Sequence, residues 1–128
     1  MTQKEYLLKL SESGKTIVGS LGSISNDLPD SAIKVKGAMG CAIAVGLGLA
    51  LNSDRDVVVV IGEGSLLMKL GSLSTVAKYR PKNLEIIVIN NGVYQSTGGQ
   101  LNNFRYVYEN RLFANDCGFI SYWTPESD

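Results

Sequence analysis

The chain has 128 residues, and its 12 basic and 12 acidic side chains give no formal net charge at pH 7. That length suits one domain with its own core, and the absence of a basic stripe argues against nucleic-acid and membrane-surface partners. Histidine is absent and the two cysteines, Cys41 and Cys117, are isolated, which argues against a zinc or iron–sulfur site.

The N-terminal segment predicts a short helix followed by a strand. Thr2 to Glu5 have the pattern of a capping box, which predicts an amphipathic helix that runs through Ser13. The polar start has no apolar run behind it, so we expect no signal peptide and a cytoplasmic location. Residues 15–20 predict the first strand, and the small residues at 21–25 predict a loop, with a turn at 26–30.

A strongly apolar segment from Gly37 to Leu51 predicts a buried helix. Gly46 and Gly48 would allow a neighbouring element to approach this helix closely. The run is too short and too rich in glycine to span a bilayer, so we expect no membrane partner. A polar surface turn is expected at residues 52–56.

Two continuous apolar runs, Val57–Ile61 and Leu84–Ile89, are typical of strands buried in a parallel sheet. A single helix is expected between them, because apolar residues recur at helical spacing and Pro81 ends the pattern. Its core-facing residues would be Leu66, Leu70, Leu73 and Ala77. The predicted fold is a doubly wound, three-layer α/β domain with a mainly parallel sheet.

Polar turns follow both apolar runs. Gly62-Glu63-Gly64-Ser65 closes the first strand and Asn90-Asn91-Gly92 closes the second. Ligands of such sheets bind outside the carboxyl ends of the strands, where both turns would lie. A carboxylate, a carboxamide and a helix N-terminus at one edge suit a divalent cation bound to a diphosphate.

The C-terminal third predicts a polar, glycine-rich stretch at 94–100, a helix at 109–117 that ends at Gly118, and a last strand at 119–123. Thr124-Pro125-Glu126 has the pattern of a helix start. We therefore expect a single domain over residues 1–128 that lacks a final C-terminal helix, or whose edge is covered by a partner.

These strings resemble the diphosphate-binding domain of thiamine diphosphate enzymes. The family's Gly-Asp-Gly turn and the Asn-Asn pair correspond to Gly62-Glu63-Gly64 and Asn90-Asn91, with glutamate in place of aspartate. The longer strings at 64–73 and 96–100 resemble the small subunit of the two-subunit sulfopyruvate decarboxylases and the equivalent part of phosphonopyruvate decarboxylases. The resemblance covers nearly the whole chain, from about Ile17 to Gly118.

The resemblance implies a site for thiamine diphosphate and Mg²⁺. The implied metal ligands are Glu63, Asn91 and the backbone carbonyl of Val93. The implied cofactor-binding residues are Gly22, Ser23, Gly37, Met39, Gly62, Gly64, Ser65, Asn91 and Val93. The carbonyl of Gly37 would accept from the cofactor's 4′-amino group, Met39 would wedge the cofactor into its bent form, and Thr97 would lie near the substrate.

The implied activity is decarboxylation of a 2-oxo acid such as sulfopyruvate or phosphonopyruvate. In the family a glutamate from a pyrimidine-binding domain activates the cofactor, which implies a separate α subunit and an α₂β₂ or larger assembly. Two alternatives stay open. The chain could be a non-catalytic relative kept for assembly or regulation, as Glu63 suggests, or the small subunit of an acyloin-forming synthase.

Several of these residues also have purely structural interpretations. Ser20, Ser23 and Ser25 could be ordinary solvated loop residues, and Met39 could be core filler.

Overall fold

The computed structural model of the chain describes residues 1–90, 93–94, 100–101 and 120–125. The helices are α1 (Gln3–Ser11), α2 (Ser23–Asp27), α3 (Ala42–Leu51), α4 (Glu63–Met68) and α5 (Ser72–Tyr79). The strands are β1 (Thr16–Gly19), β2 (Ile33–Lys34), β3 (Val57–Gly62), β4 (Leu84–Ile89), β5 (Val93–Tyr94), β6 (Gln100–Leu101) and β7 (Ile120–Trp123).

Five of these strands form one parallel sheet in the order β2-β1-β3-β4-β7, and β5 and β6 form a separate antiparallel pair. Gly19 at the end of β1 is in register with Val60 of β3, and Gly62 at the end of β3 is in register with Ile89 of β4. The predicted strands at 15–20, 57–61, 84–89 and 119–123 are confirmed to within a residue or so. Because all five strands run the same way, their carboxyl ends meet at one edge of the sheet.

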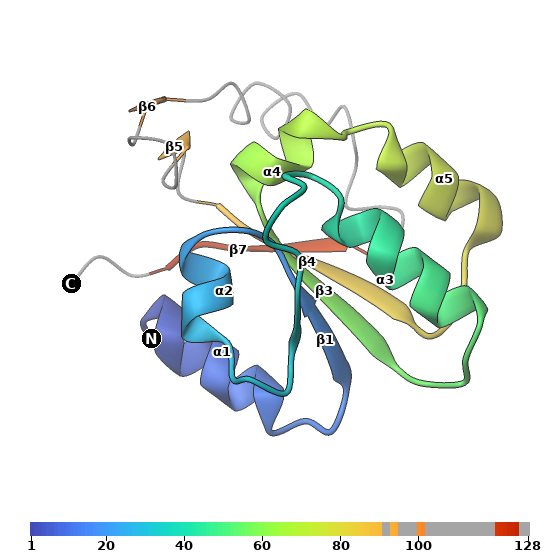
Figure 1. Ribbon diagram of the computed structural model, residues 1–128, viewed down its shortest axis with the longest axis horizontal. Coiled ribbons are helices and arrows are strands. Elements are labelled where there is room, and N and C mark those ends of the chain that lie inside the picture. Colours follow the sequence, from blue (N-terminus) through green and yellow to red (C-terminus); the bar gives the residue numbers. More distant parts are fainter. Residues whose placement is uncertain (91–92, 95–99, 102–119, 126–128) are drawn as a thin grey trace.

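Helices cover both faces of the sheet (Figure 1). Val57, Val59 and Ile61 of β3 belong to a core cluster with α3, α4 and α5. The alternate residues Val58 and Val60 belong to a second cluster with α1 and the α2 region. Burial on both faces explains why this strand is apolar at every position. The three-layer, doubly wound α/β fold predicted from the sequence is confirmed.

Helix α1 begins as the sequence predicts. The Glu5 N–H donates to the Thr2 hydroxyl at 3.2 Å, and the Thr2 N–H donates to the Glu5 carboxylate at 3.1 Å. This reciprocal capping box is confirmed, although the helix ends at Ser11 rather than Ser13. Tyr6 on this helix stacks on Trp123 of β7 with ring centroids 4.2 Å apart, so α1 is fixed against the sheet.

The buried helix predicted from Gly37 begins later, at Ala42. Gly40 has a φ of +87°, a left-handed conformation that an α-helix excludes, so residues 37–41 form a loop. The close approach predicted at Gly46 is confirmed, because a Cβ there would collide with the Val59 side chain. The same prediction for Gly48 is wrong, since no atom lies within 4 Å of its Cβ position.

The single helix predicted between β3 and β4 is wrong, because the structure has two helices there. Lys69 leaves the helical conformation with φ −135° and ψ 46°, and Gly71 caps the second helix. Hydrogen bonds of the i to i+3 type, such as Ser72 N–H to the Lys69 carbonyl at 2.9 Å, bridge the break. The change of direction buries Val76 and leaves Ala77 exposed, contrary to the prediction.

Two short elements were not predicted. Residues 23–27, expected in a loop and turn, form α2, and residues 33–34 form strand β2 at the edge of the sheet. Neither is long enough to show a hydrophobic period, so tertiary contacts decide both. The helix predicted at 109–117, its Gly118 end and the helix start at Glu126 lie outside the described residues.

Candidate functional site

The carboxyl ends of β1 and β3 form the point at which the sheet changes direction. From β1 the chain proceeds outward to β2, whereas from β3 it proceeds the other way to β4 and β7. Neighbouring strands whose connections leave in opposite directions open a crevice at their carboxyl ends, which is where ligands of this fold class bind. The two glycine turns at Gly22 and Gly62 follow these two strands.

The turn after β3 places a carboxylate and a hydroxyl in a buried position. Gly62 is the N-cap residue of α4 in an extended conformation, and Glu63 is the first helical residue. Glu63 is 1% exposed and Ser65 is 5% exposed. A carboxylate is costly to bury unless ionic, metal or hydrogen-bond partners surround it, so Glu63 is an unusual residue for this position on packing grounds alone.

The turn after β1 is held by hydrogen bonds from two directions. Gly22 has a φ of +95°, which favours glycine, and Ser23 then begins α2. The Gln3 amide donates to the Ser23 hydroxyl at 3.1 Å and to the Asp27 carboxylate at 2.9 Å, which ties α1 to α2. The Ser20 hydroxyl accepts a hydrogen bond from the Gly62 N–H at 3.3 Å, so the turns after β1 and β3 are joined directly.

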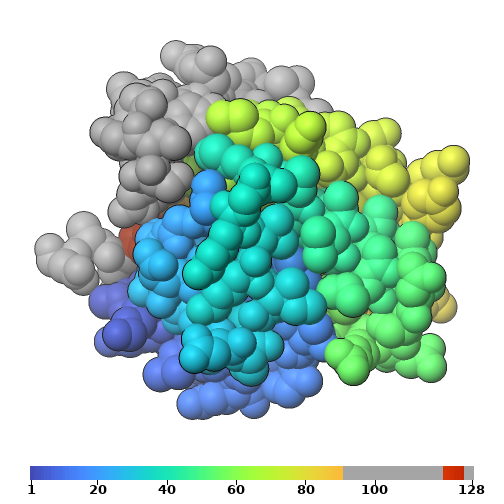
Figure 2. All heavy atoms as spheres, viewed as in Figure 1, coloured from blue at the N-terminus to red at the C-terminus, as the bar shows by residue number. Residues whose placement is uncertain are grey.

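A third segment, the loop at residues 37–40, packs against α4. A Cβ on Gly40 would lie 2.9 Å from the Ser65 carbonyl oxygen and 3.0 Å from the Met68 Cβ, so only glycine allows this approach. Figure 2 shows the segment, in teal, in contact with the yellow-green spheres of α4. Gly37 is exposed and Met39 is half-buried. Met39 therefore lies in a loop beside the candidate site rather than on the face of a helix.

The third glycine- and asparagine-rich turn, after β4, is described only in part. The Asn90 N–H donates to the Trp123 carbonyl at 2.9 Å, which fixes the end of β4 to β7. Val93 begins β5, which contacts α4, so its backbone lies near that helix. Asn91 and Thr97, and the side chain of Val93, lie outside the described residues.

The structure thus brings together three of the predicted segments at one edge of the sheet: the turn at Gly22–Ser23, the turn at Gly62–Ser65 and the loop that contains Gly37 and Met39. Two residues that the sequence interpretation left as possible solvated serines, Ser20 and Ser25, are 2% exposed and hydrogen-bonded there. Ser20 ends the predicted first strand and Ser25 ends the predicted loop that follows it, and nothing else in the sequence indicates that their hydroxyls are buried.

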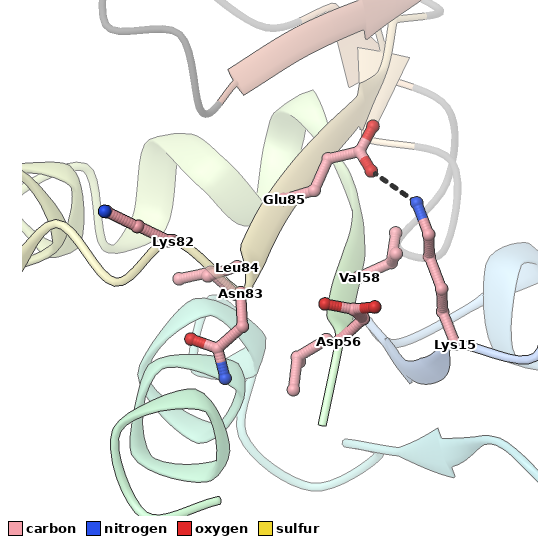
Figure 3. Close-up of a pocket in the computed structure, with 8 residues that line it drawn as sticks. Lys15, Asp56, Val58, Lys82, Asn83, Leu84 and Glu85 are labelled. Atoms are coloured by element: carbon pink, nitrogen blue, oxygen red, sulfur yellow. Dashed lines mark hydrogen bonds and ion pairs between the residues drawn. The ribbon is translucent and has the colours of Figure 1, made fainter. Parts of the chain in front are cut away.

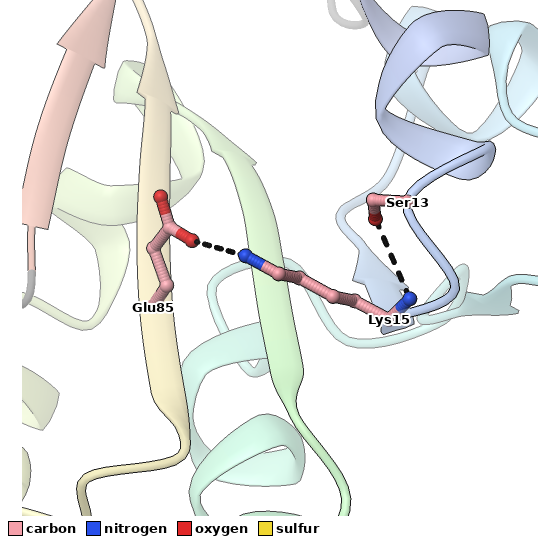
Figure 4. Close-up of polar contacts among 3 residues, drawn as sticks. All are labelled: Ser13, Lys15 and Glu85. Carbon is pink, nitrogen blue, oxygen red and sulfur yellow. Dashed lines mark hydrogen bonds and ion pairs between the residues drawn. The ribbon is translucent and has the colours of Figure 1, made fainter.

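A hollow of about 170 Å³ lies at the opposite, amino edge of the sheet (Figure 3). Its walls include Asp56, Asn83 and Lys15, and the Lys15 ammonium group is 3.4 Å from the Glu85 carboxylate (Figure 4). The Asn83 amide donates to the carbonyl of Ala50 in the last turn of α3 and to the carbonyls of Ser53 and Arg55 in the connection to β3. These hydrogen bonds fix the start of β4 to the end of α3 and the connection that follows it. The hollow lies at the edge of the sheet opposite the glycine turns.

Burial and the nearby Glu85 carboxylate, in that order of size, raise the pKa of the Tyr6 phenol above its ordinary value of 10.0.

Among the residues that the structure describes, no group of three or more histidine, cysteine, aspartate or glutamate side chains could hold a metal ion. No helix in the same part of the chain is long and apolar enough to cross a membrane.

Comparison with known proteins matches residues 18–121 to the family described as thiamine pyrophosphate enzyme, C-terminal TPP binding domain. A phosphonopyruvate decarboxylase of Streptomyces hygroscopicus is 46% identical over 101 residues, which cover 75% of this chain and 25% of that protein. The sulfopyruvate decarboxylase subunit beta of Methanocaldococcus jannaschii is 53% identical over 82 residues, which cover 64% of this chain and 44% of that subunit. The chain therefore spans less than half the length of these relatives.

Among solved structures, a protein from Mycobacterium smegmatis assigned as thiamin diphosphate-dependent matches with a TM-score of 0.67. The match covers 89% of this chain and 25% of that one, at 24% sequence identity, and it supports the fold.

Proposed function

The chain belongs to the thiamine pyrophosphate enzymes as their C-terminal TPP-binding domain, and we propose that it is the diphosphate- and metal-binding subunit of a 2-oxo acid decarboxylase. The observation that carries this proposal is the joining of two glycine turns at the switch point of the sheet, with a buried carboxylate in one of them. When bound, thiamine diphosphate supplies the electron sink that allows carbon dioxide to leave a 2-oxo acid.

The donor groups at this edge fit a hard divalent cation bound to a diphosphate. Glu63 offers a carboxylate and Ser65 a hydroxyl, and magnesium prefers such oxygen ligands. We propose that Glu63, the Asn91 side chain and the Val93 carbonyl ligate Mg²⁺. Glutamate in place of the family's aspartate puts the carboxylate one methylene farther from the backbone.

The remaining roles follow the three segments. We propose that the backbone of the turns at Gly22–Ser23 and Gly62–Ser65, with their serine hydroxyls, holds the diphosphate. The loop before α3 supports this assignment, because Gly40 holds it against α4. In that loop the Gly37 carbonyl would accept from the aminopyrimidine and Met39 would provide an apolar wall. Thr97 is proposed on the substrate side.

We propose that a pyrimidine-binding α subunit completes the active site, in an α₂β₂ or larger cytoplasmic assembly. Relatives that are named subunit beta, each of which this chain matches over 44% of its length, support the proposal. On this view the chain alone is inactive, because the family's activating glutamate comes from the pyrimidine-binding domain. Turnover of a 2-oxo acid by the purified single chain would contradict the shared site.

The substrate proposed is a 2-oxo acid with an anionic tail, as the relatives' names, phosphonopyruvate and sulfopyruvate decarboxylase, suggest for this chain. Two lysines flank the loop at residues 37–40. Lys36 directly precedes the loop and is exposed. The aliphatic part of the Lys69 side chain lies against Gly40, since its Cγ is 2.7 Å from the position that a Cβ on Gly40 would take. Among the described residues no acidic side chain pairs with either lysine. Both ammonium groups are therefore available to an anion.

The two lysines can be tested in the assembled enzyme. Lys36→Ala together with Lys69→Ala should raise KM for sulfopyruvate or phosphonopyruvate more than it lowers kcat, because the lost charges bind the tail rather than the reacting carbons. Lys78→Ala is the control, since that exposed lysine lies over the Tyr79 ring on α5. An unchanged KM in the double variant would place tail recognition elsewhere.

Calorimetric titration with thiamine diphosphate and Mg²⁺ tests the metal site. Glu63→Ala or Asn91→Ala should weaken binding by removing an oxygen from the cation's ligand shell, whereas Glu63→Asp should retain or improve it by restoring the family ligand. Glu85→Ala is a control of the same charge, because that carboxylate lies at the amino edge beside Lys15. Unchanged affinity in both site alanine variants would mean that the ion is not held here.

One observation favours a second function, that of a non-catalytic relative that keeps the fold for assembly. It is the glutamate at position 63 itself. If the assembled wild-type complex binds no thiamine diphosphate while Glu63→Asp does, the second function is the better description.

A further inference from the structure

The Ser20 side chain replaces a backbone carbonyl as the acceptor of one hydrogen bond between β1 and β3. It lies one residue beyond β1, and its N–H donates to the Val60 carbonyl at 2.9 Å, as a regular parallel ladder requires. In that pattern the next hydrogen bond would run from the Gly62 N–H to the Ser20 carbonyl. The Gly62 N–H donates instead to the Ser20 hydroxyl oxygen, at 3.3 Å.

The Ser20 carbonyl is thereby released for a different contact. It accepts a hydrogen bond from the Ser25 hydroxyl at 2.6 Å, which anchors α2 beneath the end of β1. The main chain can then leave the sheet and turn at Gly22, whose φ is +95°. Both serines are 2% exposed, so water does not readily replace either hydroxyl.

Because the Ser20 hydroxyl accepts the Gly62 N–H in place of the Ser20 carbonyl, we infer that Ser20 is a positioning residue for the cofactor site. Its side chain joins the turn that carries Gly22 and Ser23 to the turn that carries Glu63, and it fixes the amide of the residue directly before Glu63. The inference rests on the proposed function for its ligand, and the geometry itself comes from Ser20, Ser25 and Gly62 alone. Ser25 assists by holding the Ser20 carbonyl.

The positioning role follows from the location of the hydrogen bond between the Gly62 N–H and the Ser20 hydroxyl. A shift of Gly62 would move both the carboxylate of Glu63 and the first turn of α4, because Gly62 is the N-cap of that helix. The same shift would separate the two turns that are proposed to hold one diphosphate between them. Ser20 touches neither cofactor nor substrate in this scheme, so its loss should change affinity without removing a ligand.

Three variants test the inference, with inorganic pyrophosphate and Mg²⁺ as the probe for the diphosphate half of the site. Ser20→Ala removes the acceptor of the Gly62 N–H, and Ser20→Thr retains a hydroxyl. Ser53→Ala is the matched control, because it removes a partly buried hydroxyl that donates to the Leu49 carbonyl at 2.7 Å, at the end of α3. Calorimetry should be run well below the unfolding temperature of every variant.

We expect Ser20→Ala to weaken the affinity for magnesium pyrophosphate by about tenfold, in line with the loss of one buried hydrogen bond. Ser20→Thr should restore most of that loss, and Ser53→Ala should leave the affinity unchanged. Amide hydrogen exchange gives a second readout that needs no ligand. The Gly62 amide should exchange faster in Ser20→Ala than in the wild type or in Ser53→Ala.

The outcomes separate this inference from the proposed function. The proposed function, and the positioning role with it, is overturned if two results are found together. The wild-type chain alone binds no magnesium pyrophosphate, and the assembled complex binds no thiamine diphosphate. A wild type that binds while Ser20→Ala binds equally well overturns the positioning role alone. Equal weakening in Ser20→Ala and Ser53→Ala also overturns it, because the effect would then follow general stability.

Discussion

Replacing Gly40 with alanine should loosen the contact between the loop at residues 37–40 and α4. The added Cβ would lie 2.9 Å from the Ser65 carbonyl oxygen and 2.7 Å from the Lys69 Cγ. The lysine side chain can move away, but the carbonyl belongs to the backbone of α4 and cannot. The φ of +87° at Gly40 adds a second cost, because alanine rarely adopts this conformation.

The two costs can be estimated separately. An alanine in a left-handed conformation is destabilised by roughly 1–2 kcal/mol, and overpacking against fixed atoms costs typically about 1–3 kcal/mol. We therefore expect Gly40→Ala to lower the free energy of unfolding by about 3 kcal/mol. For a domain of this size that corresponds to a decrease in Tm of roughly 10 °C.

Gly37→Ala provides the matched control within the same loop. No atom lies within 4 Å of the Cβ position at Gly37, and its φ is not in the left-handed region, so this variant should unfold near the wild-type temperature. Calorimetric unfolding measures stability, and titration with thiamine diphosphate and Mg²⁺ then tests whether the displaced loop weakens binding. Equal unfolding temperatures in the two variants would refute the reasoning.

Three further predictions concern the frame around the site and are measured by urea unfolding. Gly46→Ala should destabilise the fold by about 1–3 kcal/mol, because the added Cβ collides with a core valine. Gly48→Ala should stabilise the fold by about 0.5–1 kcal/mol, because there is open space at that position. Equal effects of the two substitutions would contradict the packing. Burial and then Glu85 raise the pKa of Tyr6, so the stability this phenol contributes is complete below pH 10.0 and is lost as pH rises through the folded-state pKa. Tyr6→Phe should therefore flatten the loss above pH 10.0, and an unchanged slope would deny the shift. Asn83→Ala should cost about 2 kcal/mol because it leaves three backbone carbonyls without their donor, and a neutral result would mean that water replaces it.

The sheet and its site edge were predictable because their signals are local and strong. Residues of β3 are apolar at every position since helices cover both faces, and the same holds for most of β4. A glycine-rich turn directly after such a strand can only lie at the carboxyl edge. The capping box at Thr2 and Glu5 was predictable for a similar reason, because both partners lie within one helical turn.

The features that the sequence did not reveal depend on contacts between distant segments. Leucine spacing continues through residues 66–73, so the pattern gives no sign that the helix breaks at Lys69. The left-handed conformation of Gly40 follows from its packing against α4, which no local pattern encodes. Ser20 forms its hydrogen bond with Gly62, 42 residues away in the chain, so its role is visible only after β1 and β3 are paired.

Two contacts hold the backbone on either side of Glu63. Before it, the Ser20 hydroxyl accepts the Gly62 N–H, and after it, Gly40 packs against the Ser65 carbonyl. Because the main chain is held at both points, the position of the carboxylate depends mainly on the length of the side chain. The comparison of the wild type with Glu63→Asp therefore measures the effect of one methylene on metal ligation. A gain in affinity would mean that the longer side chain reaches past the ideal position, and a loss would mean that the facing turns have adapted to glutamate.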